Sequence, residues 1–186
     1  MSGRIKGTIL QSRKSFVSER FGSDGLEKVL ASMKPEDQEV LRGMILPLSW
    51  YDLGTCLRFD EAIIKVMGGN AQQAFRDLGR KSADDNLAKF QAGFVRGKTP
   101  LTFLAQTPAI YRLYYEVGSR EFTKTSETSG ILTTHNAENV TPGDCLTVMG
   151  WHERALELVG AKRPNMSHPT CRATGGATCI YHVTWT

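Results

Sequence analysis

The residues best suited to chemistry are three cysteines and one histidine in the last quarter of the chain: Cys145, His168, Cys171 and Cys179. Two residues separate the histidine from Cys171, and seven separate Cys171 from Cys179. Three thiolates and one imidazole suit a tetrahedral Zn²⁺ ion, and a closed set of four protein ligands is typical of a structural site. The spacing is wider than in common zinc motifs, so the cysteines are alternatively interpreted as small buried apolar residues.

The elements around these residues would bring them together. We predict a helix over residues 142–160, capped by Thr141, with Cys145 in its first turn and on its buried face. Two strands follow, at about 163–172 and 177–185, joined by a turn that contains two glycines. The start of the helix and the hairpin would therefore meet where the four candidate ligands lie.

The rest of the chain supplies helices and a second hairpin. Apolar spacing predicts helices over 5–21, 24–33, a stretch opened by Pro35, 53–66 and 70–95, with 48–53 as a turn or connector. From Gly118 the sequence becomes rich in threonine and serine and predicts two strands joined by a turn. The order indicates an α+β fold in which N-terminal helices pack on a small antiparallel sheet, with one helix between two C-terminal hairpins. We expect one domain over residues 1–186.

A ligand pocket is a second candidate site. Its apolar walls would come from four aromatic residues, Trp50, Phe59, Tyr111 and Tyr115, and its polar groups from Thr147 and His152 on the 142–160 helix. The alternative interpretation is that these aromatic residues are ordinary parts of the core.

Bulk composition excludes several classes of protein. Apolar residues make up 40% of 186 residues, too many for a disordered chain. The net charge of +4 comes from interleaved basic and acidic residues, which predicts solvated surfaces and no nucleic-acid partner. We see no apolar run that could span a membrane and no secretory leader, so we expect a cytoplasmic protein with reduced cysteines. No catalytic motif argues for an enzyme.

The stretch over residues 143–185 resembles the C-terminal part of the 4-vinyl reductase-type domains, the sensory domains of phenol-responsive activators. Their relatives at the level of fold include subunits of the TRAPP trafficking complex and heme-NO-binding domains. In these sensors, positions equivalent to Cys145, Cys171 and Cys179 hold zinc, and His168 stands where the family has a carboxylate. Earlier segments resemble uncharacterised bacterial proteins placed near the heme-NO-binding domains.

The resemblance implies a non-catalytic domain, homodimeric, that senses a small apolar ligand or binds a partner protein. A purely structural protein-protein interaction module is the alternative. A tetrapyrrole-related reductase is a weaker alternative, because the name of the family suggests it and no residue does. We predict that the protein does not bind heme, because the heme-binding relatives bind the heme propionates through a Tyr-x-Ser-x-Arg motif. Here Tyr115 is separated from Ser119 and Arg120 by a different spacing, and no histidine occupies the proximal-helix position.

Overall fold

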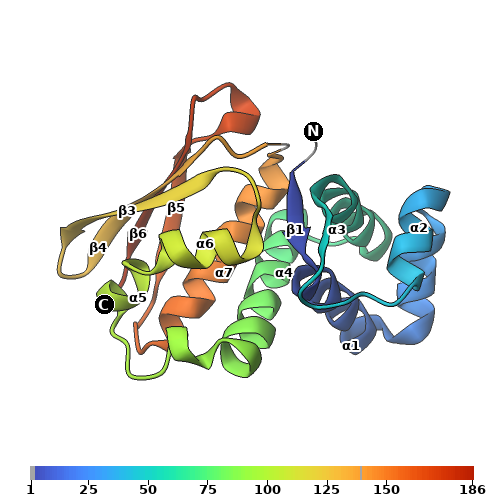
Figure 1. The fold of residues 1–186 in the computed structure, drawn as a ribbon, viewed down its shortest axis with the longest axis horizontal. Helices are drawn as coiled ribbons and strands as arrows, with labels where there is room; N and C mark the ends of the chain where they lie inside the picture. Colours follow the sequence, from blue (N-terminus) through green and yellow to red (C-terminus); the bar gives the residue numbers. More distant parts are fainter. Residues whose placement is uncertain (1–2, 139) are drawn as a thin grey trace.

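A computed structural model describes residues 3–138 and 140–186, without the side chains of residues 89 and 90. It has the predicted α+β architecture (Figure 1). A group of N-terminal helices lies on one side, a four-stranded antiparallel sheet on the other, and two long helices run between them (Figure 1). One of these helices separates the two C-terminal hairpins in sequence, as predicted.

The helices follow the apolar spacing of the sequence closely. They are α1 (Gly7–Ala31), α2 (Pro35–Arg42), α3 (Leu53–Met67), α4 (Ala71–Asp85), α5 (Pro100–Leu104), α6 (Thr107–Tyr114) and α7 (Pro142–Leu158). Gly22 is non-helical within α1, with φ of 70°, so the two predicted N-terminal helices are the two arms of a kinked one. The predicted 70–95 helix ends earlier, in a π turn (Asn86–Phe90) and a short 3-10 turn (Ala92–Phe94). Within the described ranges, no helix is both long and apolar enough to cross a membrane.

The main sheet is built from the two predicted hairpins. Its strands are β3 (Ser119–Ser126), β4 (Ser129–His135), β5 (Asn165–Thr170) and β6 (Cys179–Thr184), in the order β3-β4-β6-β5. Alternate residues of β6 are buried, as expected for a sheet with one covered face. The pairing of Thr134 with Cys179 and of Leu132 with Tyr181 places these side chains on that buried face.

A second, two-stranded sheet joins the start of the chain to the α2–α3 connection. Its strands are β1 (Arg4–Lys6) and β2 (Trp50–Asp52), which pair antiparallel. The prediction of a turn or connector over 48–53 is therefore wrong for half of that segment, residues 50–52. A three-residue strand shows too little alternation to be recognised in a sequence, and its partner here is more than 40 residues away.

Helices α4 and α7 cross at very short range because each has a glycine at the contact. A Cβ atom on Gly150 would lie 2.1 Å from the carbonyl oxygen of Arg76, and one on Gly79 would lie 2.0 Å from that of Thr147. Both obstacles are backbone atoms, so no side-chain rotation can relieve the overlap. This crossing positions the α7 residues of both candidate sites.

We expect Gly150→Ala to lower the free energy of unfolding by about 3 kcal/mol or more, at the upper end of overpacking costs, because the helices must separate. Gly93→Ala is the matched control, since no atom lies within 4 Å of the Cβ position at residue 93. Urea unfolding of the two variants measures the difference. Equal stability of the two variants would contradict the close crossing.

Candidate functional site

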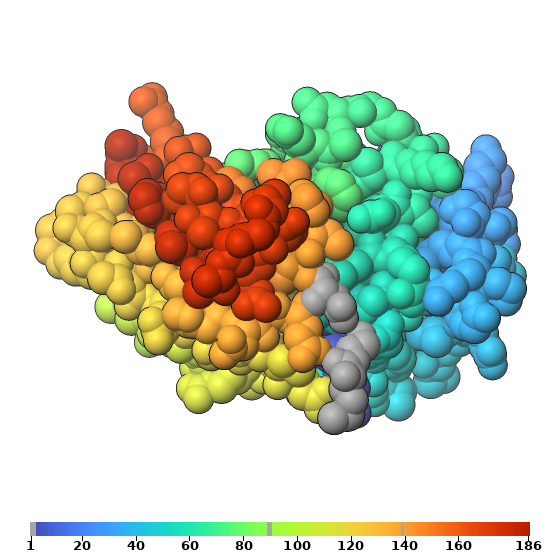
Figure 2. Space-filling model, turned by 90° about the horizontal axis from the view of Figure 1, so that it is seen from above, coloured from blue at the N-terminus to red at the C-terminus, as the bar shows by residue number. Residues whose placement is uncertain are grey.

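The four predicted metal ligands lie together at one end of the sheet. Their ligand atoms are all within 4.8 Å of one another. Cys145 comes from the first turn of α7, His168 from β5, Cys171 from the end of β5 and Cys179 from the first position of β6. Figure 2 shows the β5–β6 hairpin (red) at the surface beside the segment that begins α7 (orange). We call these four residues the Cys3His cluster.

The geometry of the cluster suits a tetrahedral ion. The Cys145 sulfur lies 3.6 Å from the Cys171 sulfur and 4.0 Å from the Cys179 sulfur. Zinc–sulfur bonds of about 2.3 Å place two thiolates of a tetrahedral site about 3.8 Å apart. In the described residues, Nε2 of His168 is buried with no hydrogen-bond partner. A buried nitrogen of this kind is costly, and a bound cation at this nitrogen would remove the cost.

The surroundings of the cluster also favour thiolate. The backbone N–H of Arg172 donates to the Cys179 sulfur at 3.4 Å. The neighbouring Cys145 thiol, together with this N–H and His168, lowers the pKa of Cys179 to about 5. The same contact with Cys179 raises the pKa of Cys145, so the thiolate is favoured at Cys179 and not at Cys145. The ring of His168 is held in place by stacking on Tyr181, with the ring centroids 4.3 Å apart.

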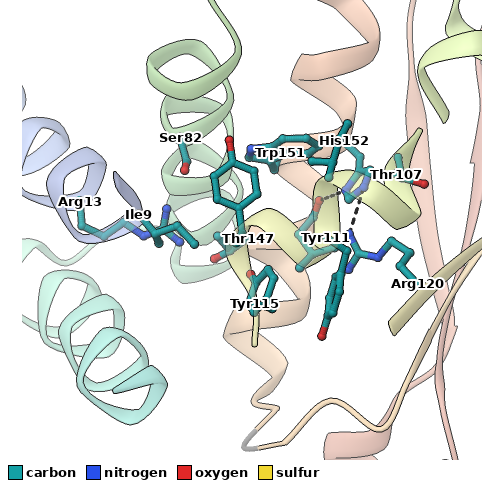
Figure 3. A pocket seen from close by; sticks show the side chains of 13 residues that line it. Ile9, Arg13, Ser82, Thr107, Tyr111, Tyr115, Arg120, Thr147, Trp151 and His152 are labelled. Atoms are coloured by element: carbon teal, nitrogen blue, oxygen red, sulfur yellow. Dashed lines mark hydrogen bonds between the residues drawn. The ribbon is translucent and has the colours of Figure 1, made fainter. Parts of the chain in front are cut away.

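A second candidate site is a small cavity between the helices and the sheet, which we call the central cavity. Its volume is about 50 Å³. Figure 3 shows side chains from α1, α4, α6, β3 and α7 around it. Four of the six predicted ligand contacts line it, namely Tyr111, Tyr115, Thr147 and His152. The structure also places there residues that the sequence analysis did not select, including Ile9, Arg13, Ser82, Arg120 and Trp151.

The other two predicted contacts do not reach the central cavity. Trp50 lies in β2, where the Lys6 amine sits 3.7 Å from its ring centroid. Phe59 is completely buried in the core beneath α3. Both residues were selected on the expectation that neighbouring aromatic residues share one wall, and the structure does not bring them to this cavity. The β1–β2 pairing holds Trp50 elsewhere, and the helical position of Phe59 directs it to the core.

The polar part of the central cavity is built around Arg120 and His152. The Arg120 guanidinium donates through Nη1 to Nε2 of His152 at 3.1 Å and through Nε to Thr134 Oγ1 at 3.1 Å. Nδ1 of the imidazole lies 2.8 Å from the Val148 carbonyl oxygen and donates to it. Burial, with Arg120 adding to it, lowers the pKa of His152 to about 3. The imidazole is therefore neutral, and its Nε2 lone pair faces Arg120 (Figure 3).

Arg120 was missed as a site residue although the sequence carries a signal for it. It is buried at an inward position of β3, where the flanking residues point to solvent. An arginine at such a position is unusual unless it has a specific partner. A second buried arginine, Arg13 on α1, also lines the cavity and forms a two-point ion pair with Asp60 of α3.

Comparison with known proteins identifies the fold of this chain but does not assign the chain to a sequence family. No family model matches the chain, and no curated protein matches it in sequence. Solved structures do match over nearly the whole length. An H-NOX protein from S. oneidensis in its Fe(II)NO state aligns with a TM-score of 0.77 at 14% identity, covering 97% of this chain and 99% of that one. An Fe(II) unliganded H-NOX mutant from K. algicida gives 0.75 at 12%, covering 97% and 96%. A structure from a study of heme distortion in the H-NOX family gives 0.72 at 13%, covering 97% and 95%.

The chain therefore has the H-NOX fold. This confirms the part of the predicted resemblance that pointed, at the level of fold, to heme-NO-binding domains. The narrower assignment to the 4-vinyl reductase and TRAPP groups stays a prediction. The prediction against heme is corrected by the same finding, because the similar solved structures are H-NOX proteins described in Fe(II) and Fe(II)NO states and in work on heme distortion. That prediction rested on the spacing of one motif and on the lack of a histidine at the proximal-helix position, and a fold shared at this level of identity does not depend on single motif residues.

Heme is thus the cofactor that the fold implies, and the central cavity holds two groups of the kind that a heme uses. These are a neutral imidazole at His152, the protonation state that binds metals, and the cationic Arg120, which has no carboxylate partner among the described residues, whereas Arg13 is already paired with Asp60. Its walls are aromatic. A volume of about 50 Å³ is far below the roughly 300 Å³ or more of organic-ligand pockets, so a porphyrin requires the walls to separate. The stacked pair Tyr111 and Tyr115, with ring centroids 4.8 Å apart, forms a wall that would have to move.

Proposed function

We propose that this protein is a non-catalytic sensory domain that binds a small molecule in the central cavity. The observation that carries the proposal is the buried Arg120–His152 pair, which lines a cavity between the helical and sheet halves of an H-NOX fold. A buried arginine hydrogen-bonded to a neutral imidazole is an expensive arrangement in a core. This arrangement is expected where a bound ligand contacts both the guanidinium and the imidazole.

Heme is the ligand that the structural relatives favour. In this proposal His152 would hold the metal through Nε2, and Arg120 would be the cation for a propionate, with Arg13, which also lines the cavity, still paired with Asp60. A bound heme iron would supply a position for a diatomic gas. The Val148 carbonyl keeps the imidazole in the tautomer with an unprotonated Nε2, the usual state of a metal-binding histidine.

Titration of the purified protein with hemin, followed by absorbance, tests this proposal. We expect a saturable complex with one heme per chain, and a loss of affinity of at least about tenfold in His152→Ala, since a metal ligand is removed. His182→Ala is the matched control, because His182 is exposed on β6. Absence of saturable binding, or equal binding by the two variants, would exclude heme at this site. A thermal-shift screen with small aromatic and acyl compounds then tests the remaining apolar ligands.

We also propose that the Cys3His cluster binds one structural zinc ion. The support is the convergence of four ligand atoms within 4.8 Å, with the sulfur separations of a tetrahedral site. The ion would tie the start of α7 to the β5–β6 hairpin. It would thereby fix the helix that carries Thr147 and His152. Homodimerisation, a partner protein that receives the signal and a cytoplasmic location remain further proposals, based on the sequence.

A further inference from the structure

The connection between α2 and β2 holds a group of exposed apolar side chains. Within residues 43–49, which we call the 43–49 loop, Met44 is 87% exposed, Leu48 80% and Leu46 52%. Val40, one helical turn before Met44, adds a further exposed side chain at 37%. Single exposed apolar residues are ordinary, but a contiguous group of this kind marks an interaction surface.

The exposure is imposed by a well-fixed backbone. The amides of Gly7 and Thr8 donate to the carbonyls of Ser49 and Pro47 at 3.0 and 3.1 Å. The Gln11 side chain donates to the Ile45 carbonyl at 2.7 Å, and the Leu46 amide donates to the Tyr51 hydroxyl at 2.8 Å. These bonds, together with the buried Ile45, hold the loop on α1, so that Met44, Leu46 and Leu48 stay in solvent. A preorganised surface loses little conformational entropy when it binds.

Two further side chains give this surface an amphipathic edge. The Lys6 amine donates to the Leu48 carbonyl at 2.9 Å and lies 3.7 Å from the centroid of the half-buried Trp50 ring. Tryptophan rings and lysine amines are the groups that proteins place at the boundary between lipid and water. The surface therefore has an aliphatic tip with an aromatic and cationic edge behind it.

We propose that the 43–49 loop docks on a lipid membrane by inserting Met44, Leu46 and Leu48 between the headgroups. Side chains exposed by 80% or more project from the surface, and a bilayer accepts a projecting apolar tip without a matching groove. The apolar area is on the order of 400 Å², about half of what each partner buries in a stable protein complex. A second copy of the chain would therefore be held poorly by this patch alone.

Charge contributes less than apolar insertion. The chain has a net charge of +4, which favours an anionic surface, but Glu36 and Glu39 are exposed on the adjoining helix α2. We therefore expect binding to neutral phosphatidylcholine vesicles, with only a several-fold gain when phosphatidylglycerol is included. A protein held mainly by charge would bind only the anionic vesicles.

Co-sedimentation of the full chain with both kinds of vesicle tests the proposal. The double variant Met44→Ser/Leu48→Ser should partition at least about tenfold less than the parent. Leu113→Ser is the matched control, because Leu113 is exposed by 41% on α6, away from the loop, and it should bind like the parent. Both variants should keep the parent's melting temperature. Lipid should also shift the tryptophan emission to shorter wavelength, and Trp50→Phe should remove most of that shift.

Two results would overturn the inference. One is the absence of partitioning of the parent protein into either vesicle. The other is partitioning that is the same in the parent and in the Met44→Ser/Leu48→Ser variant. Sedimentation equilibrium without lipid tests the competing explanation, that this patch joins two copies of the chain. In that case the parent would self-associate, the double variant would be monomeric, and neither would bind vesicles. None of these measurements depends on heme or zinc. Failure of the membrane proposal can therefore be distinguished from failure of the proposed function.

Discussion

Replacement of Cys171 by serine is expected to remove zinc from the protein and to lower its free energy of unfolding by more than about 4 kcal/mol, because metal binding at a closed site is coupled to folding. Cys171 is the most informative position, since it is only half-buried and packs at the edge of the core. A loss well above the cost of about 1–3 kcal/mol expected for replacing one packed thiol cannot come from that packing alone. It would come from releasing the start of α7 from the β5–β6 hairpin.

The measurements are elemental analysis and thermal melting, with and without a chelator. The parent protein, purified without chelator, should contain about one zinc per chain and should melt at lower temperature once the metal is removed. Cys56→Ser is the matched control. Cys56 is a buried thiol on α3 outside the Cys3His cluster, so its replacement should cost about 1–3 kcal/mol and leave the zinc content unchanged. A metal-free parent with a melting temperature that is insensitive to chelator would contradict the zinc site.

The cluster could be predicted because its determinants are local. Thr141 accepts from the Asp144 amide at the start of α7, as a threonine before a proline predicts, and this fixes where Cys145 lies. A glycine-containing turn then brings the two cysteines of the hairpin back toward each other. Capping residues and turn residues determine the backbone over only a few positions, so their effect can be predicted from the local sequence.

The central cavity was harder to predict because its determinants are distant in sequence. Arg120 meets His152 across 32 positions, and Arg13 meets Asp60 across 47. Periodicity tells which face of an element is buried, but not which buried faces meet. This is why Tyr111, Tyr115, Thr147 and His152 were found on buried faces, whereas Arg120 was overlooked. The same limit explains Phe59, which is buried as expected but in another part of the core.

The Arg13–Asp60 pair should be the most sensitive point of the core outside the Cys3His cluster. Nε and Nη2 of the arginine donate to the two carboxylate oxygens at 2.9 and 3.1 Å, and both side chains are only 4% exposed. Burial raises the pKa of Asp60 more than Arg13 lowers it. The carboxylate is therefore stable as an ion only while the guanidinium is beside it. Breaking a buried pair by removing one partner typically costs about 3–5 kcal/mol.

We therefore expect Asp60→Asn to lower the free energy of unfolding by about 3–5 kcal/mol, since it leaves the Arg13 charge in the core without a counter-charge. The double variant Arg13→Met/Asp60→Leu should recover most of this loss, because it removes both charges and keeps the volume filled. Urea unfolding of the parent, the single and the double variant forms the required comparison. If the double variant were as unstable as the single variant, the pair would stabilise the core through side-chain packing and not through charge compensation. Hemin titration of the double variant then separates the roles of the two arginines, because Arg120 remains in the cavity as the only lining arginine among the described residues.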